Sequence, residues 1–250
     1  KAGGSLKLGY VLGRDLSQSL KYQLKKTEIR NVDETASTLI KEQEGTNTVS
    51  QISQTTVLDK RDNRYEPKDG YVVSLTNELA GLSGDTQHLR TRIKTGYFAS
   101  LFEDKVLAFT AESGHIIGID QDVNIGERFF LGGQTVRGFS NSGIGPRDGL
   151  TYDALGGNTY YAGSMELRFP LGLGEELGIN GSLFTDVGSL WSLDRDSSDI
   201  LDSSGARASA GFGVSWATGL GLMRVDFASA LLKEDWDETE FVRFSFGTRF

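Results

Sequence analysis

The chain has 250 residues with three prolines and no cysteine, and its 26 lysine and arginine residues against 34 aspartate and glutamate residues give a formal net charge of −8. The lack of cysteine excludes disulfides and thiolate metal sites, and the acidic balance offers no basic surface for nucleic acid. No run approaches the roughly 18 consecutive apolar residues of a spanning helix, so the chain either is soluble or crosses a membrane as strands of about 9–11 alternating residues.

Eleven strand-like runs are predicted along the chain, and no linker-like segment separates them, so one large all-β domain is expected. The predicted strands are 4–13, 17–30, 47–60, 70–82, 87–102, 105–117, 158–170, 177–190, 206–217, 221–231 and 240–250. They are longer than the usual strand of about 5–6 residues in globular proteins. Tilted membrane strands that continue past the bilayer would have this length.

Alternation gives the predicted strands one apolar face and one small or polar face. In 177–190 the odd positions, such as Leu177 and Leu183, are mostly apolar, whereas Asp186 lies on the even face. The last strand carries three phenylalanines on its apolar face: Phe244, Phe246 and Phe250. A soluble sandwich and a water-filled barrel would both produce this pattern, so a single strand does not distinguish them.

Basic side chains follow one another on the polar face of 87–102, which carries His88, Arg90, Arg92 and Lys94. They could line a path for anions, although a charged lumen face is usual in any barrel. The two histidines, His88 and His115, are not spaced as metal ligands. No metal site and no cofactor is therefore expected.

The connections between the predicted strands alternate in length. Residues 103–104, 171–176 and 218–220 form short turns, whereas 31–46, 118–157 and 191–205 form long loops. Two connections fit less well, because 60–69 is long for the short side and 83–86 is brief for the long side. Short turns at one end and long loops at the other are typical of outer-membrane barrels. We therefore predict a transmembrane antiparallel β-barrel.

The strand count is odd. Single-chain bacterial barrels have an even number of strands, so residues 1–250 are expected to be an N-terminally incomplete barrel domain. A missed or merged strand would restore an even count.

The connection 118–157 is rich in glycine and has no sustained apolar periodicity. Loops of this length inside a compact domain are usually functional or disordered. Disorder fits poorly, because Phe129, Phe130 and Leu131 give this loop apolar side chains of its own. We expect it to fold back onto the barrel with Arg137 at its tip.

Two acidic residues could receive that arginine. Glu166 and Asp186 lie on successive predicted strands, and alternation points both away from the apolar faces. Paired strands would place both carboxylates in one interior, where the planar guanidinium of Arg137 could bind them in a bidentate manner. Acid/base catalysis by the two carboxylates is conceivable, but no nucleophile motif lies nearby, so no enzyme is expected.

Three separated motifs carry a family resemblance. They are the loop tetrapeptide Val136-Arg137-Gly138-Phe139, the strand motif Phe184-x-Asp186-x-Gly188, and a terminal strand that ends in Phe250. In this order they resemble the C-terminal barrel region of the Omp85 superfamily, most closely its BamA branch of outer-membrane assembly factors.

The resemblance implies a barrel of sixteen strands, of which this chain would hold the last eleven or twelve, without the periplasmic POTRA domains. It implies that the long loop enters the lumen and that Arg137 contacts Glu166 and Asp186 there. It also implies insertion of β-barrel proteins into the outer membrane of a Gram-negative bacterium. The expected partners are unfolded outer-membrane proteins, accessory lipoproteins reached through POTRA domains, and outer-membrane lipid.

Other functions stay open. The TamA and two-partner secretion branches share the loop tetrapeptide, so a related translocase is an alternative. A passive diffusion channel, with the loop as its constriction, is the alternative from another class. For an insertase, we expect the unpaired edge of the last strand to template an incoming strand. The three terminal phenylalanines would serve as interfacial aromatics, as a signal for assembly of the barrel itself, or as both.

Overall fold

The computed structural model describes residues 2–102, 104–172, 178–195, 199–218 and 221–247. One antiparallel sheet of eleven strands accounts for most of this chain. The strands are β1 (Ala2–Val11), β2 (Leu16–Ile29), β3 (Gly45–Asp59), β4 (Gly70–Gly84), β5 (His88–Phe102), β6 (Lys105–Gly118), β8 (Thr159–Pro170), β9 (Ile179–Trp191), β11 (Arg207–Thr218), β12 (Gly221–Leu232) and β13 (Val242–Phe246).

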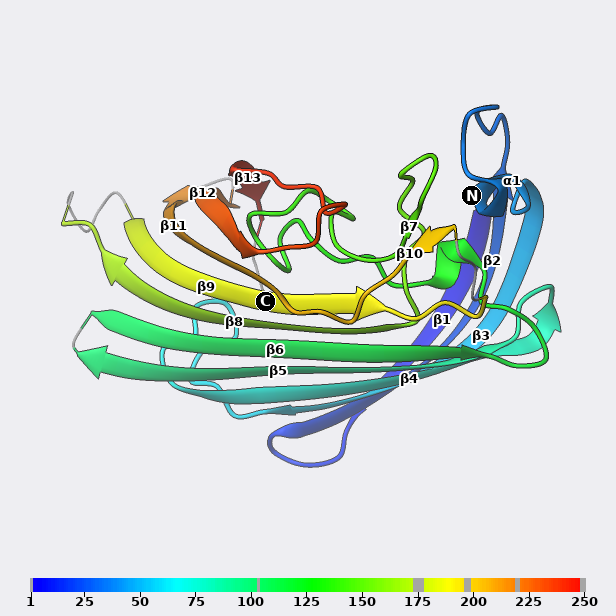
Figure 1. The fold of residues 1–250 in the computed structure, drawn as a ribbon. Helices are drawn as coiled ribbons and strands as arrows, with labels where there is room; N and C mark the ends of the chain where they lie inside the picture. The colour runs from blue at the N-terminus through cyan, green and yellow to red at the C-terminus, as the bar shows by residue number, and fades with distance from the viewer. Residues whose placement is uncertain (1, 103, 173–177, 196–198, 219–220, 248–250) are drawn as a thin grey trace.

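Each strand of this sheet pairs with the next long strand along the chain. Figure 1 shows that the sheet curls into a trough, with the connection between β6 and β8 lying on its concave side. The predicted number and order of the long strands are confirmed. Among the described residues no pairing joins β1 to β13, so these two strands form the edges of the sheet.

The observed strand limits differ from the predicted ones by a few residues. The largest difference is at the last strand, where 240–250 was predicted and Val242–Phe246 is observed. Phe250 and Leu177 lie outside the described residues. Glu240 is not part of the last strand because its amide bonds to the long loop, through the Gly138 carbonyl at 3.1 Å, rather than to β12.

Three short elements lie in connections for which no regular structure was predicted. They are the helix α1 (Thr38–Lys41), the 3-10 helix η1 (Ile125–Glu127), and a two-stranded sheet of β7 (Arg147–Asp148) and β10 (Ile200–Leu201). Such short elements depend on contacts with neighbouring loops, which local sequence patterns do not reveal. No helix within the described ranges combines the length and the apolar character needed to span a bilayer.

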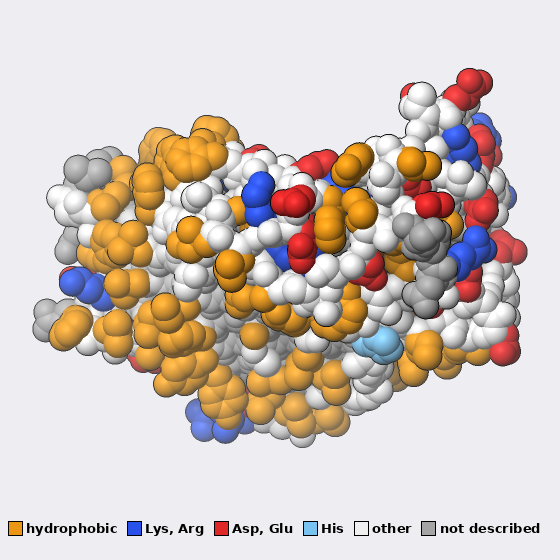
Figure 2. Space-filling view, viewed as in Figure 1, with side chains coloured by type: hydrophobic (Ala, Val, Ile, Leu, Met, Phe, Trp, Pro, Cys, Tyr) orange, Lys and Arg blue, Asp and Glu red, His pale blue; other side chains and the backbone are white. Residues whose placement is uncertain are grey.

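The apolar and polar faces of the strands are inverted relative to a soluble domain. On β9, Leu183 is 53% exposed on the convex face, whereas the neighbouring Ser182 and Phe184 are buried on the concave face. Hydrophobic side chains gather over the outer surface of the strands in Figure 2, and acidic ones gather at the end that carries α1. A convex face of this kind suits lipid, which leaves the concave face as the lumen wall.

The buried apolar cluster forms between the long loop and the concave wall. Its loop members include Phe129, Leu131, Val136 and Phe139, and its wall members include Leu190. The interior therefore depends on the loop for its packing, and an empty trough would expose the wall residues to water.

The turn between β3 and β4 is longer than the other turns at the short-turn end of the sheet. Hydrogen bonds among its own polar groups stabilise it. Asp62 Oδ1 accepts hydrogen bonds from the amides of Lys68 and Asp69 at 3.0 and 3.2 Å. Arg61 forms a two-pronged contact with Asp59, at 2.8 and 2.9 Å. Pro67 at the tip is buried, so this turn folds inward at the short-turn end of the trough.

We predict that Leu183→Arg destabilises the protein in a lipid bilayer by about 2–4 kcal/mol, because it places a charge on the lipid face near the middle of a strand. Urea unfolding in lipid vesicles measures the change. The matched control is Ser74→Arg, whose side chain lines a cavity of about 480 Å³ inside the trough. A larger loss of stability for Ser74→Arg than for Leu183→Arg would contradict the assignment of the two faces.

Candidate functional site

The tip of the long loop is a tight turn pressed against the lumen wall. Gly133 donates its amide to the carbonyl of Phe139 at 3.0 Å, which closes the turn. Gly138 has φ +87, a conformation that favours glycine. Val136 and Phe139 on either side of Arg137 and Gly138 are fully buried. These contacts fix the direction in which Arg137 points.

Asp186 on β9 receives Arg137 through three hydrogen bonds. Its two carboxylate oxygens accept from Nε and Nη2 of Arg137, each at 2.7 Å. The Arg137 backbone amide donates to the same carboxylate at 2.9 Å. Both side chains are almost completely buried. This two-pronged contact uses the planar fork of a guanidinium, which a lysine lacks.

Residues of β8 accept the other hydrogen bonds of the Arg137 guanidinium. Arg137 Nη1 donates to Glu166 Oε2 at 2.6 Å, and Nη2 donates to Ser164 Oγ at 2.9 Å. The Arg137 Cζ atom also lies 3.3 Å from the centre of the Phe184 ring, within the range of a cation–π contact. The structure thus brings Arg137, Glu166 and Asp186 into one cluster.

The spacing of Phe184-x-Asp186-x-Gly188 follows from strand geometry. Residues two apart point to the same side of a strand, so all three positions face the loop tip. Phe184 lies against the guanidinium and Asp186 accepts it. A Cβ atom at Gly188 would lie 2.8 Å from Val136 Cγ2 and 3.0 Å from the Tyr161 carbonyl oxygen. Gly188 therefore leaves room for the tip.

The sequence reasoning missed three members of this cluster. Arg224 on β12 donates to both Glu166 oxygens at 3.1 and 2.8 Å. Arg224 also contacts Asp226 at 2.8 Å. Arg168 Nε donates to Glu166 Oε1 at 2.8 Å. The alternation Arg224-x-Asp226 on one strand face was the available signal.

The six charges of the cluster balance. Three arginines carry three positive charges, and one glutamate and two aspartates carry three negative charges; the members are Arg137, Arg168, Arg224, Glu166, Asp186 and Asp226. A buried ion pair adds little net stability over apolar packing, but removal of one partner is costly because it leaves a buried charge unpaired. The cluster is therefore better suited to fixing one loop position than to raising stability.

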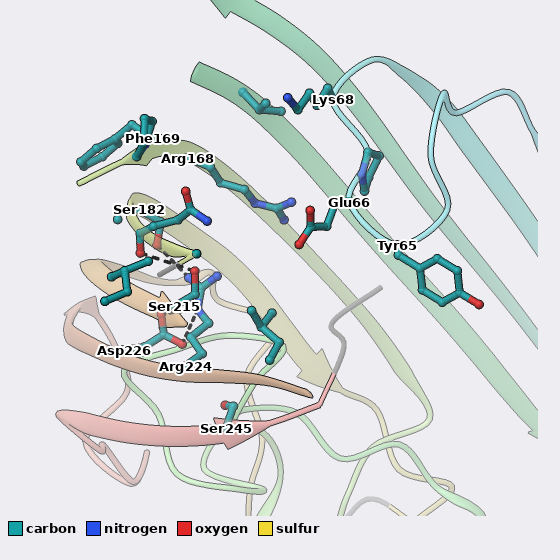
Figure 3. A pocket seen from close by; sticks show the side chains of 18 of the residues that line it. Tyr65, Glu66, Lys68, Arg168, Phe169, Ser182, Ser215, Arg224, Asp226 and Ser245 are labelled. Atoms are coloured by element: carbon teal, nitrogen blue, oxygen red, sulfur yellow. Dashed lines mark hydrogen bonds and ion pairs between the residues drawn. The ribbon is translucent and has the colours of Figure 1, made fainter. Parts of the chain in front are cut away.

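A cavity of about 430 Å³ opens beside this cluster at the short-turn end of the trough. Figure 3 shows Arg224, Asp226 and Ser182 on one side of it, and Tyr65, Glu66 and Lys68 of the inward turn on the other. The cavity also reaches β13 at Ser245. The loop cluster and the edge strand therefore border one space.

The outer part of the loop is attached to β2, β5 and the α1 connection. The buried Glu127 side chain accepts from Lys25 at 2.8 Å and lies 3.4 Å from Arg90. Ser37 donates its hydroxyl to Asp148 at 2.7 Å and its amide to Asp153 at 2.7 Å.

The hydrogen bond from the Ser37 hydroxyl is the main cause that lowers the pKa of Asp148. Because the pKa of Asp148 is lowered, this contact stabilises the fold at pH values above the ordinary pKa of an aspartate. The stabilisation is lost as the pH falls through the lowered pKa.

The basic row on β5 has acidic and aromatic neighbours. Arg90 contacts Glu78 at 3.0 Å and Lys94 contacts Glu112 at 2.6 Å. Arg92 lies over the Phe129 ring of the loop. These contacts offset the positive charge of the row, so a path for anions gains no support from it.

The two histidines lie on opposite faces of the sheet. His88 is buried on the lumen side, and His115 on β6 lies on the convex side with its Nδ1 2.8 Å from Thr159 Oγ1. Within the described ranges no group of three or more potential metal-ligating side chains occurs.

The phenylalanines of the last strand face away from the trough. Phe244 is 77% exposed and Phe246 is 65% exposed on the convex side of β13. β13 pairs with β12 along one side, from Met223↔Phe246 to Phe227↔Val242. Its other side has no partner strand among the described residues.

Comparison with known proteins gives consistent matches. The profile of the Omp85 superfamily domain matches residues 1–250. The chain is 38% identical over 244 residues to "Outer membrane protein assembly factor BamA" of Neorickettsia risticii (strain Illinois), a match that covers 97% of this chain and 33% of that protein. It is 37% identical over 171 residues to "Sorting and assembly machinery component 50 homolog" of Xenopus tropicalis, covering 67% of this chain and 36% of that protein.

Solved structures show the same fold. The structure resembles that of BamA from Haemophilus ducreyi lacking POTRA domains 1–3, with a TM-score of 0.83 and 20% identity, over 97% of this chain and 53% of that one. It resembles CdiB from Acinetobacter baumannii less closely, with a TM-score of 0.62 and 14% identity, over 95% and 40% of the two chains. The chain spans about a third of the length of the curated relatives it matches.

We predict that Arg137→Ala releases the loop, because it leaves the carboxylates of Asp186 and Glu166 short of a partner at a cost of about 3–5 kcal/mol. Limited proteolysis of residues 118–157 measures the release. Arg137→Lys should restore protection only in part, since an ammonium cannot make the planar contact. We call the contact of Arg137 with Asp186 and Glu166 the clamp. Unchanged protease sensitivity in Arg137→Ala would contradict the clamp, and full protection in Arg137→Lys would show that charge alone suffices.

We predict that Gly188→Ala loosens the same loop by pushing Val136 away, at a cost of about 1–3 kcal/mol. The control is Gly163→Ala on the adjacent strand, where a Cβ would meet Val187 at an ordinary 3.6 Å. Thermal unfolding and proteolysis should separate the two variants. Equal effects would contradict the role assigned to Gly188.

Proposed function

The chain belongs to the Omp85 superfamily, and from this premise we propose that it is the barrel part of an outer-membrane protein insertase. In this proposal it folds and inserts other β-barrel proteins into the outer membrane of a Gram-negative bacterium. One observation carries the proposal: a loop that lies inside the trough is locked to the wall by a buried guanidinium shared between Asp186 and Glu166.

The clamp supports an assembly role because it holds the strands of the wall together without filling the trough. The cluster joins β8, β9 and β12 through one loop side chain and Arg224. The cavities of about 430 and 480 Å³ on the short-turn side keep space next to it. A wall held in this way keeps its strand register while its free edge binds another chain.

The edge strand β13 supplies the proposed site of action. Its unpaired backbone groups can pair with an extended polypeptide, as strand addition to a sheet edge does in other proteins. Its inner side is already paired with β12, so an added strand would pair on the opposite side. The proposed ligands are unfolded β-barrel proteins of the outer membrane.

The proposal extends to partners outside this chain. The matched BamA and component 50 homologues are named as an assembly factor and as a part of an assembly machinery. By analogy we propose that accessory lipoproteins bind through POTRA domains and that outer-membrane lipid surrounds the convex face.

We predict that vesicles containing the protein accelerate the folding of a urea-unfolded outer-membrane barrel protein, and that Arg137→Ala abolishes most of the acceleration. Heat-modifiable gel mobility of the substrate measures folding. Arg64→Ala, which removes an arginine whose side chain is 81% exposed, is the control and should act as the unchanged protein does. Equal acceleration by Arg137→Ala and the unchanged protein would contradict the role of Arg137 in insertion. A steady open-pore current without any acceleration would favour a passive channel instead.

A further inference from the structure

The connection between β12 and β13 crosses directly over the tip of the long loop. Residues 238–240 run antiparallel to residues 138–143, and Phe139 forms a bridge with Thr239. We call residues 237–241 the strap. The strap ends one residue before β13, so its position bears on where the edge strand begins.

Backbone hydrogen bonds join the strap to the loop tip. The amide of Ser140 donates to the Glu238 carbonyl at 3.0 Å, and the amide of Glu240 donates to the Gly138 carbonyl at 3.1 Å. The amide of Glu238 donates to the Gly143 carbonyl at 3.0 Å. Gly138 follows Arg137 directly, so one peptide unit separates the clamp from the strap.

A second buried ion pair holds the strap to the wall. Arg207 at the start of β11 donates Nε to Asp237 Oδ2 at 2.9 Å, and neither side chain is accessible to solvent. Arg207 Nη1 also donates to the carbonyls of Ser203 and Gly205, each at 2.8 Å. The same Asp237 oxygen accepts the Glu234 amide at 2.8 Å. This pair is separate from the cluster around Arg137.

The loop also holds the strap from its other side. Arg147, which is buried in the loop, donates Nη1 to Glu238 at 2.8 Å. A Cβ atom at Gly143 would lie 2.4 Å from the Glu238 carbonyl oxygen, so the two backbones approach as closely as glycine permits. At its far end the strap returns to the sheet, where the Phe241 carbonyl accepts the Ala228 amide at 2.9 Å.

From these contacts we propose that Asp237 and Arg207 are positioning residues for the edge strand. They hold the strap, and the strap couples the position of β13 to the state of the Arg137 clamp. A polypeptide strand that pairs with the free edge of β13 pulls on the strap, and through Gly138 on the clamp. This inference rests on the proposed function, which assigns the free edge of β13 as the place where a substrate strand pairs.

The coupling predicts reciprocal effects, because a coupling free energy between two sites acts in both directions. Loss of the Arg207–Asp237 pair should expose the amides of the strap and of β13. Loss of Arg137 should do the same at a distance, although Arg137 does not belong to either segment. A clamp and a strap that act independently would not show the second effect.

Hydrogen–deuterium exchange of the protein in lipid vesicles tests the proposal. In Asp237→Asn the buried Arg207 loses its counter-charge, so exchange in residues 238–246 should rise about tenfold or more. Asp237→Glu should restore protection in part. The control is Asp235→Asn, the same change of charge at an exposed position two residues earlier, which should leave exchange unchanged. Residues 70–102 of β4 and β5 report whether each variant has folded.

Three results would overturn the proposal: unchanged exchange of β13 in a folded Asp237→Asn variant, equal effects of Asp235→Asn and Asp237→Asn, or unchanged exchange of residues 238–246 in Arg137→Ala. These readouts need no substrate. A raised exchange of β13 in both Asp237→Asn and Arg137→Ala, together with no acceleration of substrate folding by the unchanged protein, would support the coupling and remove the proposed insertase function.

Discussion

The buried contact between Arg137 and the two carboxylates on β8 and β9 is the constraint on which the interior of this protein depends. A charge that is buried away from water is favourable only where its donors find acceptors. Arg137 has such a position, with Asp186, Glu166 and Ser164 around it. Apolar packing of the tip could slide by a fraction of a side chain, whereas this arrangement of donors and acceptors cannot.

The long loop packs against the concave face of the sheet, as a second sheet does in a soluble sandwich. The convex face is apolar and suits lipid. In the described part of the chain, residues 119–158 rather than a second large sheet cover the concave face (Figure 1). Phe129, Leu131 and Val136 pack on wall residues such as Leu190. The same loop carries the clamp, so packing and charge pairing reinforce one position, and the space that remains lies beside the clamp rather than under it.

One buried charge cluster and one separate buried ion pair hold two different parts of the molecule, the wall and the connection to the edge strand. The first cluster joins β8, β9 and β12 to the loop. The second pair, Arg207 with Asp237, holds the connection that leads into β13. A backbone hydrogen bond from the Glu240 amide to the Gly138 carbonyl links the two. In the proposed function, such an arrangement would set the position of β13 from inside the trough while its outer edge pairs with another strand.

The sequence by itself determined the strands and the loop, because a period of two and the placement of glycines are local properties. Eleven strands and their order were predictable, and so was the direction of Asp186 and Glu166, which follows from alternation. The tertiary structure alone decided which charges meet. Arg224, Asp226 and the Arg207–Asp237 pair join strands and loops far apart in the chain. Such pairings depend on how the sheet curls and where the connection after β12 crosses the loop, which no local pattern of residues encodes.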